Sequence, residues 1–266
     1  LRIMGLRPGS LHAVLVRKWL IQAVALAHNE AGTSQAAEGV LTMQGGQGIG
    51  KTMLARRLSI WEEWFAEGVS LDMKDKDSIL RATGAWIAEL GELDSTLKRE
   101  QSSLKAFITA KVDRVRAPYA REATGRPRRT SFLATVNPDT FLRDETGDRR
   151  FWVVPAGGMD LPALIALSDE WFVQLWTEVY LWWKQEPQGF RLTQEERRAL
   201  DKANRVYREM LPGEEEIRQA LSWDIPFEQW GWFTSTELRR QLFEIERLSP
   251  QQIGRALAKL VREDER

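Results

Sequence analysis

Residues 45–52 of this chain read Gly45-Gly46-Gln47-Gly48-Ile49-Gly50-Lys51-Thr52, which fits the phosphate-binding loop pattern G-x-x-x-x-G-K-[ST]. Glycines let the backbone curl so that successive N–H groups point at one anion. In this pattern Lys51 faces the β- and γ-phosphates of a nucleotide, and the Thr52 hydroxyl ligates Mg²⁺. The stretch therefore predicts a binding site for ATP and Mg²⁺ made by residues 45–52.

The flanking residues agree with this prediction. Val40–Met43 is a short apolar run typical of a buried strand. After the loop, Leu54, Leu58, Trp61 and Phe65 recur at helical spacing. A strand, a glycine loop and a helix N-terminus together make an anion site. A chance glycine-rich turn, which is the alternative, would not need these flanks.

The composition narrows the class of protein. The 266 residues suit one large α/β domain, or one with a small appendage. The 38 Lys and Arg residues balance the 38 Asp and Glu residues, so any contact with nucleic acid must come from a local basic patch. The absence of cysteine excludes disulfides and thiolate metal sites, and His12 and His28 form no ligand cluster.

No apolar stretch is long enough to cross a bilayer, and no signal peptide is visible. We therefore expect a cytoplasmic protein without a membrane partner. The chain begins with Leu1 rather than Met, so we also expect a fragment whose upstream domains are missing.

Apolar runs and turn signals predict four regions. Residues 1–39 are a helical lead-in, 40–158 the ATPase core, 159–210 a helical tryptophan-rich region, and 214–266 a small helical domain. Helices are expected at Leu11–His28 and Leu97–Ala110, and further strands at Val69–Leu71, Ala85–Leu90, Ser131–Val136 and Phe151–Val154. Five strands alternating with helices predict an α/β fold with a mostly parallel five-stranded sheet.

Two neighbouring aromatic stripes at helical spacing mark the segment from Leu161 to Trp183. One stripe contains Trp171, Leu175, Val179 and Trp182, and the other Phe172, Trp176, Tyr180 and Trp183. Packing between helices explains such a surface most simply. A contact between subunits is the alternative, because aromatic residues anchor interfaces. A capping box at Thr193–Glu196 opens the next helix.

The tail follows a linker at Leu211–Gly213. A capping box at Thr234–Glu237 starts one short helix, and Ser249-Pro250 starts the last one. Two short helices joined by a tight turn resemble a helix-turn-helix, or a winged helix cut off at Arg266. A packing subdomain that touches no DNA is the alternative.

Hydrolysis needs an acidic residue on a strand beside the loop, to hold Mg²⁺ or to orient water. Glu89 ends an apolar strand and is the expected metal ligand together with Thr52, and Glu92 is the candidate water-orienting base. The usual motif has Asp first, so the division of labour between the two stays open. A solvated acidic turn is the alternative.

Three polar residues follow or precede later strands. Asn137 follows the strand Ser131–Val136, where its amide can position water against the γ-phosphate. Arg149 and Arg150 precede the strand at Phe151, and one of them is expected to stabilise the transferring phosphoryl group. One or both would instead be structural if they pair with Asp144, Glu145 or Asp148.

The segment from Lys111 to Arg129 holds seven basic and two acidic residues. On a bent hairpin these cations suit the phosphates of single-stranded DNA, and an aromatic ring can stack on a base. A solvated loop is the alternative. The candidate DNA contacts are Lys111, Arg114, Arg116, Tyr119, Arg121, Arg128 and Arg129.

Four stretches together resemble the virulence-associated protein E family: GGQGIGKT, WIAELGEL, LKAFITAKVDRVRAPYAR and FLATVNPDTFLRDETGDRRFW. The last, from Phe132 to Trp152, is the most specific. The resemblance spans about residues 10–185 and does not cover the tail beyond Leu211.

This resemblance implies an AAA+ ATPase related to superfamily-three helicases of phages and mobile elements. It implies Lys51 and Thr52 as Walker A, Glu89 and Glu92 as Walker B, Asn137 as sensor, and Arg149 or Arg150 as arginine finger. It also implies a hexamer-like ring on single-stranded DNA, in a bacterial host, with a primase domain upstream.

The expected function is ATP-driven DNA unwinding in replication. An ATPase switch that controls assembly or DNA binding without unwinding is the alternative. A metabolite kinase would need a closing lid and a second-substrate pocket, and the sequence gives no sign of either.

Overall fold

The computed structural model describes residues 1–71, 75–91, 93, 104–115, 124–142, 148–223, 225, 229, 231 and 233–264. The chain divides into two compact units, Leu1–Arg208 and Glu209–Arg266. Among the described residues, no helix is long and apolar enough to cross a membrane.

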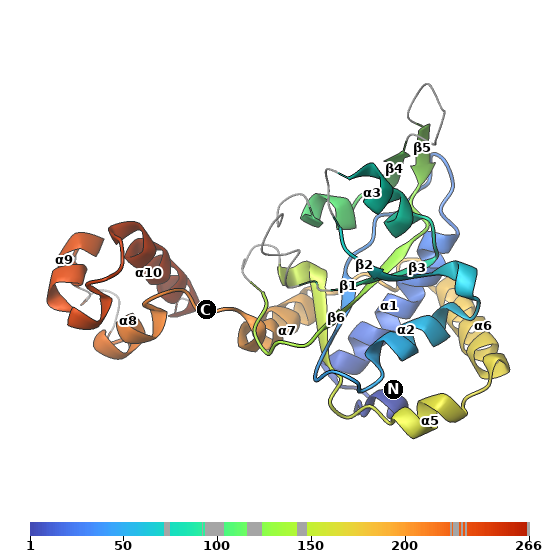
Figure 1. The fold of residues 1–266 in the computed structure, drawn as a ribbon, viewed down its shortest axis with the longest axis horizontal. Helices are drawn as coiled ribbons and strands as arrows, with labels where there is room; N and C mark the ends of the chain where they lie inside the picture. The colour runs from blue at the N-terminus through green and yellow to red at the C-terminus, as the bar shows by residue number, and fades with distance from the viewer. Residues whose placement is uncertain are drawn as a thin grey trace. The chain divides into compact units, whose positions relative to one another are not determined.

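The first unit is built on a five-stranded sheet with the strand order β2-β3-β6-β1-β7. The strands are β1 (Val40–Gln44), β2 (Phe65–Val69), β3 (Ile87–Leu90), β6 (Ser131–Val136) and β7 (Phe151–Pro155). Every neighbouring pair is parallel, so the expected mixed α/β fold with a parallel five-stranded sheet is confirmed (Figure 1). All five strands therefore end at the same edge, which is where open α/β sheets bind ligands.

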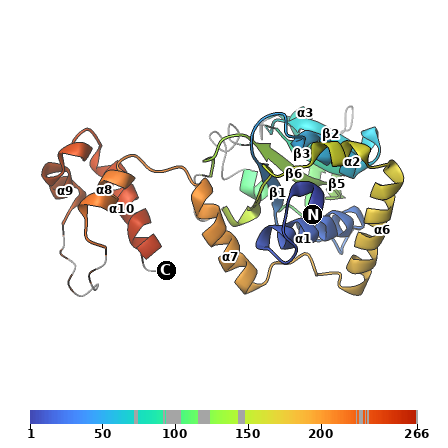
Figure 2. The same ribbon diagram turned by 90° about the horizontal axis from the view of Figure 1, so that it is seen from below.

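Helices cover both faces of the sheet. Figures 1 and 2 show α1 (Leu11–Ala27), α2 (Lys51–Ser59) and α6 (Asp169–Gln185) on one face and α3 (Lys76–Thr83) on the other. Alternate residues of a strand enter the two cores: Leu41 and Met43 pack with the first group, and Val40 with the second. Trp19 of α1 is fully buried and its indole N–H donates to the Phe132 carbonyl at 2.8 Å, which fixes α1 on β6.

The segment after the glycine loop differs from its prediction. The helix α2 ends at Ser59, so Trp61 and Phe65 do not lie on it, and Phe65 begins β2 instead. The cause is Ile60, whose φ of 68° is a conformation that β-branched residues rarely adopt and that cannot continue a helix. The second strand accordingly ends at Val69, where it was expected to begin.

The tryptophan-rich segment forms two helices, α5 (Leu161–Ala166) and α6, with Ser168 as the N-cap of α6. Phe172, Trp176 and Val179 are buried, so this face of α6 packs in the core. The Trp176 indole donates to the Leu58 carbonyl at 2.7 Å. Trp171 and Tyr180 remain partly exposed. The next helix, α7 (Gln194–Asn204), begins with the predicted capping box of Thr193 and Glu196.

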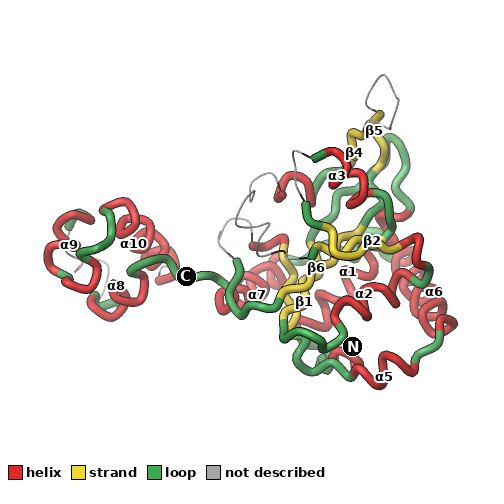
Figure 3. The backbone as a smooth tube through the Cα atoms, viewed as in Figure 1, coloured by secondary structure: helices red, strands yellow, loops and turns green. Residues whose placement is uncertain are grey.

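The basic segment contains an antiparallel hairpin of β4 (Val112–Val115) and β5 (Thr124–Pro127). Of the helix predicted at Leu97–Ala110, residues 104–108 are helical and 97–103 lie outside the described residues. The tube in Figure 3 shows the hairpin as the one two-stranded yellow element set apart from the main sheet in the part of the chain that is drawn in colour.

The second unit packs α8 (Glu214–Ala220), α9 (Ser235–Gln241) and α10 (Pro250–Asp264) around Ile217, Leu238, Ile253 and Leu260. The predicted capping box of Thr234 and Glu237 opens α9. Residues 242–249, with a 3-10 turn at Phe243–Ile245, separate α9 from α10. This connection is longer than the tight turn expected for a helix-turn-helix.

Candidate nucleotide-binding site

The glycine loop, residues 45–50, joins the end of β1 directly to the first residue of α2. Gly48 and Gly50 have φ values of 79° and 98°, in the left-handed region that glycine tolerates. A side chain at Gly50 would also lie 2.8 Å from Leu161 of α5. The loop therefore needs glycine at its tight positions, and it leads into the positive end of a helix.

Lys51 lies under this loop and is only 6% exposed. Its Nζ donates to the Gly45 carbonyl at 2.6 Å, the Gly46 carbonyl at 2.7 Å and Oδ1 of Asn137 at 3.0 Å. Burial lowers the pKa of Lys51, and the Glu89 carboxylate works in the opposite direction. A phosphate oxygen exchanged for one of these neutral acceptors would gain a charge-assisted hydrogen bond from a desolvated cation.

Thr52 and Glu89 form a second group of polar contacts in the candidate site, next to Lys51. The Thr52 hydroxyl donates to Oε1 of Glu89 at 2.7 Å, and the Thr135 hydroxyl of β6 donates to the same oxygen at 2.9 Å. Glu89 is 2% exposed. Two hydroxyls thus orient one buried carboxylate beside the first turn of α2.

The donor set fits Mg²⁺ bound partly by substrate. Thr52 and Glu89 supply hard oxygen atoms, and Mg²⁺ usually takes one or two protein ligands, with phosphate and water completing the octahedron. In the part of the chain that the structure describes, no group of three acidic or histidine side chains makes an independent metal site. Glu92, the other candidate acid, lies outside the described residues.

Arg149 and Arg150 lie at the amino ends of the strands, whereas Lys51, Thr52 and Asn137 lie at the carboxyl ends. The two arginines end the 3-10 turn Asp148–Arg150 and directly precede β7, whose first residue, Phe151, is paired with Val40 at the start of β1. The glycine loop follows the other end of β1. The five residues of β1 span roughly 16 Å at about 3.3 Å per residue. That distance is beyond the reach of one arginine side chain, so neither arginine meets Lys51 of its own chain.

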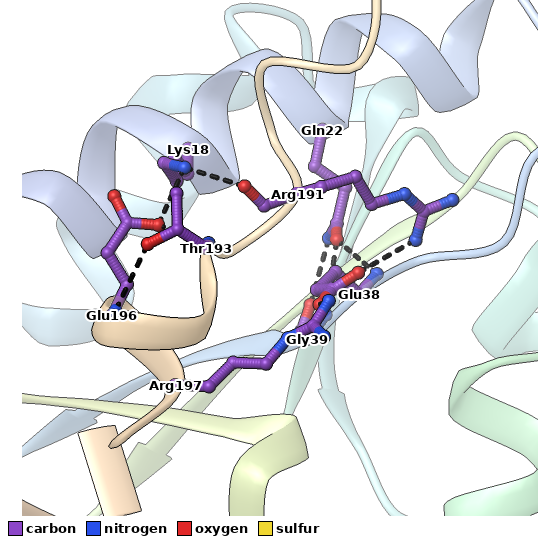
Figure 4. Close-up of polar contacts among 8 residues, drawn as sticks. All are labelled: Lys18, Gln22, Glu38, Gly39, Arg191, Thr193, Glu196 and Arg197. Atoms are coloured by element: carbon purple, nitrogen blue, oxygen red, sulfur yellow. Dashed lines mark hydrogen bonds and ion pairs between the residues drawn. The ribbon is translucent and has the colours of Figure 1, made fainter. Parts of the chain in front are cut away.

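The two arginines open into a cleft of about 250 Å³ that Glu38, Thr109 and Arg197 also line. Glu38 is already engaged: it accepts from Arg191 and from Arg197 at 2.9 Å each, while Gln22 holds the backbone of Glu38 and Gly39 (Figure 4). No carboxylate of the described residues pairs with Arg149 or Arg150. Burial and the neighbouring Arg149 lower the pKa of Arg150.

Asp148, one of the partners considered for these arginines, binds elsewhere. Its Oδ2 accepts from Nε of Arg208 at 2.7 Å, and Arg208 also donates to Asp201 at 2.7 Å. Burial raises the pKa of Asp148 to about 6, although the Arg208 hydrogen bond opposes the shift. Sequence reasoning missed this cluster, because its members are far apart in the chain. Asp144 and Glu145 lie outside the described residues.

A family model, the virulence-associated protein E-like domain, matches residues 1–209. The chain belongs to this family. The match ends at residue 209, next to the boundary between the two compact units, and does not extend over residues 210–266.

Two solved structures are similar at the level of the chain trace. One is the A form apo structure of the NrS-1 C-terminal region, with 15% identity, a TM-score of 0.43, and coverage of 84% of this chain and 58% of that one. The other is the region 305–718 of NrS-1, with 16% identity, a TM-score of 0.43, and coverage of 83% and 57%. The chain thus spans less than two thirds of either. No curated protein matches.

The candidate DNA contacts on the hairpin of this virulence-associated protein E-like domain differ in their exposure to solvent. Lys111, Arg114 and Arg129 are exposed, and Arg116, Tyr119 and Arg121 lie outside the described residues. Arg128 is 1% exposed. Its Nε donates to both Asp113 oxygens at 2.6 and 2.7 Å, and its NH1 to the Phe107 carbonyl at 3.0 Å. The expectation that Arg128 contacts DNA is therefore corrected: the residue holds the hairpin on the core.

Proposed function

We propose that this chain is the ATP-hydrolysing motor of a DNA helicase that replicates a phage or mobile genetic element in the cytoplasm of a bacterial host. The observation that supports this most is the meeting of Lys51, Thr52, Glu89 and Asn137. Lys51 and Thr52 begin α2 directly after the glycine loop, Glu89 lies on β3 and Asn137 follows β6. The buried ammonium of Lys51 donates to Asn137, and the Thr52 hydroxyl donates to the buried carboxylate of Glu89.

In the proposed reaction, backbone N–H groups of residues 45–50 and the ammonium of Lys51 bind the β- and γ-phosphates of ATP. Thr52 and Glu89 hold Mg²⁺, which neutralises charge on the phosphates when bound. The carboxylate of Glu89, with or without Glu92, orients the attacking water, and the Asn137 amide positions that water against the γ-phosphate.

Stabilisation of the transferring phosphoryl group comes from Arg149 or Arg150 of a neighbouring copy. The position of both arginines across the sheet from Lys51 supports action in trans, as does the absence of a carboxylate partner among the described residues. A homo-oligomeric, hexamer-like ring on single-stranded DNA provides such neighbours. An upstream primase domain in the full-length protein would fit the same role.

Two assays on one preparation test the proposal. The first measures ATP hydrolysis with and without single-stranded DNA, and the second measures displacement of a labelled strand from a forked duplex. Wild type is expected to do both, and Lys51→Ala neither, because the loop loses its cation. Hydrolysis without displacement would favour the ATPase switch, and phosphate transfer to a small acceptor would favour a kinase.

The hairpin contributes a separate test of DNA as the partner. Replacing Lys111 and Arg114 together should flatten the salt dependence of single-strand binding by about 0.7 in the log–log slope per lost phosphate contact. ATP binding should survive in this variant, since both residues lie outside the nucleotide site. An unchanged slope would mean that the hairpin is a solvated loop.

A further inference from the structure

A cleft of about 780 Å³ opens at the amino edge of the sheet, across from the nucleotide site. Trp64, Trp86, Asp113, Arg126, Arg129 and Thr130 are among the residues that line it. Trp86 and Thr130 directly precede β3 and β6, whereas Glu89 and Asn137 lie toward the carboxyl ends of the same two strands. The cleft is therefore a separate site on the same pair of strands.

Two tryptophans give the cleft a fixed aromatic wall. The Trp86 indole donates to the Ala23 carbonyl at 3.0 Å, and its ring lies 4.5 Å from that of Trp176. Trp64 meets Trp86 edge to face, with 5.7 Å between ring centroids and an interplanar angle of 86°. Because Trp86 is anchored and Trp64 is still 40% exposed, Trp64 offers a ring to a ligand at little cost in side-chain entropy.

The charges that face this wall are positive. Asp113 lines the cleft, but both of its carboxylate oxygens accept from Arg128. Arg129 is exposed and its Nε donates to the Asn29 carbonyl at 3.1 Å, which orients the guanidinium. Arg126 is exposed as well, and within the described residues no carboxylate pairs with Arg126 or Arg129. Two cations therefore remain for an anionic ligand.

We propose that this cleft binds single-stranded DNA, with a base stacked on Trp64 and backbone phosphates at Arg126 and Arg129. Aromatic rings stack on any base and cations follow the phosphates, which is how strands are bound without sequence preference. A strand fits better than a mononucleotide because the exposed Lys111 lies on the same face of the hairpin as Arg126: Asp113 is paired with Arg126, and Lys111 comes two residues before Asp113. The inference takes DNA as ligand from the proposed function but needs no ATP hydrolysis.

The experiment measures binding of a fluorescein-labelled oligothymidylate by anisotropy, without nucleotide. Trp64→Ala should weaken binding about 5- to 100-fold, and Trp64→Phe should retain most of it. Arg126→Ala and Arg129→Ala together should lower the salt slope by about 0.7 per lost contact. Trp171→Ala, at a similarly exposed tryptophan on α6 (43%), and Arg198→Ala, at an exposed arginine of α7, are the matched controls and should bind normally.

Lys51→Ala separates this site from the ATP site, because it should bind the oligonucleotide like wild type while failing to hydrolyse ATP. If wild type hydrolyses no ATP but Trp64→Ala still weakens oligonucleotide binding, the cleft assignment is supported and the proposed ATPase function is wrong. Unchanged binding by Trp64→Ala would overturn the cleft assignment. So would competition by thymidine monophosphate as strong, per nucleotide, as by the oligonucleotide, since a mononucleotide pocket would then be present.

Discussion

The ammonium of Lys51 donates a 3.0 Å hydrogen bond to the amide oxygen of Asn137, across 86 residues of sequence. This contact joins the first residue of α2 to the residue that follows β6, because β1 and β6 are adjacent and parallel. The side chain proposed to grip the γ-phosphate and the side chain proposed to place water beside it are thus held at one point.

Replacing Asn137 with Ala should lower the rate of ATP turnover by as much as about 100-fold and change ATP affinity much less, since misplaced water costs rate rather than binding. Turnover and the affinity for a fluorescent ATP analogue are the two measurements. Asn137→Asp is the informative companion: its carboxylate can keep Lys51 but repels the phosphates, so ATP affinity should also fall. Equal turnover in Asn137→Ala and wild type would contradict the sensor role.

Glu89→Gln should keep ATP bound while reducing turnover by roughly 100-fold or more, because the amide cannot accept a proton from water. The amide oxygen can still accept from Thr52 and Thr135, so the fold should persist. Single-turnover hydrolysis with equilibrium ATP binding checks this. Thr135→Val removes one of the two hydroxyls on Glu89 and should have a smaller effect. Normal turnover by Glu89→Gln would mean that another residue acts as the base.

Specific ATPase activity should rise with protein concentration if Arg149 or Arg150 acts in trans. Lys51→Ala mixed with the double variant Arg149→Ala/Arg150→Ala should partly restore hydrolysis, because some contacts then join an intact loop to an intact arginine. Such an arginine contributes about 10³- to 10⁵-fold to turnover in other phosphoryl-transfer proteins. Activity independent of concentration, without rescue in the mixture, would rule out the ring.

Asp148 should make stability depend on pH. Its pKa rises on folding from the ordinary value of 3.8 to about 6, so the folded state binds more protons between these values and loses stability as pH rises through them. The unfolding free energy of wild type minus that of Asp148→Asn should therefore fall between about pH 4 and pH 7, by at most about 3 kcal/mol. Denaturant titrations of both proteins at several pH values measure it. A difference that grows with pH would mean that the Arg208 pair outweighs burial.

Sequence alone predicts the parts of this molecule that local chemistry determines. The glycine loop and the capping boxes at Thr193 and Thr234 are encoded within a few residues. The strand Ser131–Val136 has the predicted bounds, because its apolar run ends at a polar residue on each side. Lys51, Thr52, Glu89 and Asn137 meet because the loop after β1 leads into Lys51 and Thr52, Glu89 lies near the end of β3 and Asn137 follows β6, and parallel strands end at the same edge of the sheet.

The sequence predictions are wrong where contacts between distant residues, or an unusual backbone conformation, determine the structure. Trp61 and Phe65 continue the spacing of Leu58, but a left-handed residue at Ile60 ends the helix first. Arg128 looks like its basic neighbours until the hairpin register places Asp113 against it. The pair Asp148–Arg208 and the wall of Trp64 and Trp86 each join segments that have no common local pattern, so only the folded chain reveals them.

Because Arg150 and Lys51 lie at opposite ends of β1, a contact between them on two copies is head-to-tail, and the two faces that meet are different. An open row of copies would leave one terminal loop without an arginine and one terminal arginine without a loop, whereas closure supplies both. Turnover per copy should then increase with the length of the row and level off once the row closes. Short assemblies would be poor ATPases even with every copy folded. Full ATPase activity would therefore require the ring to close.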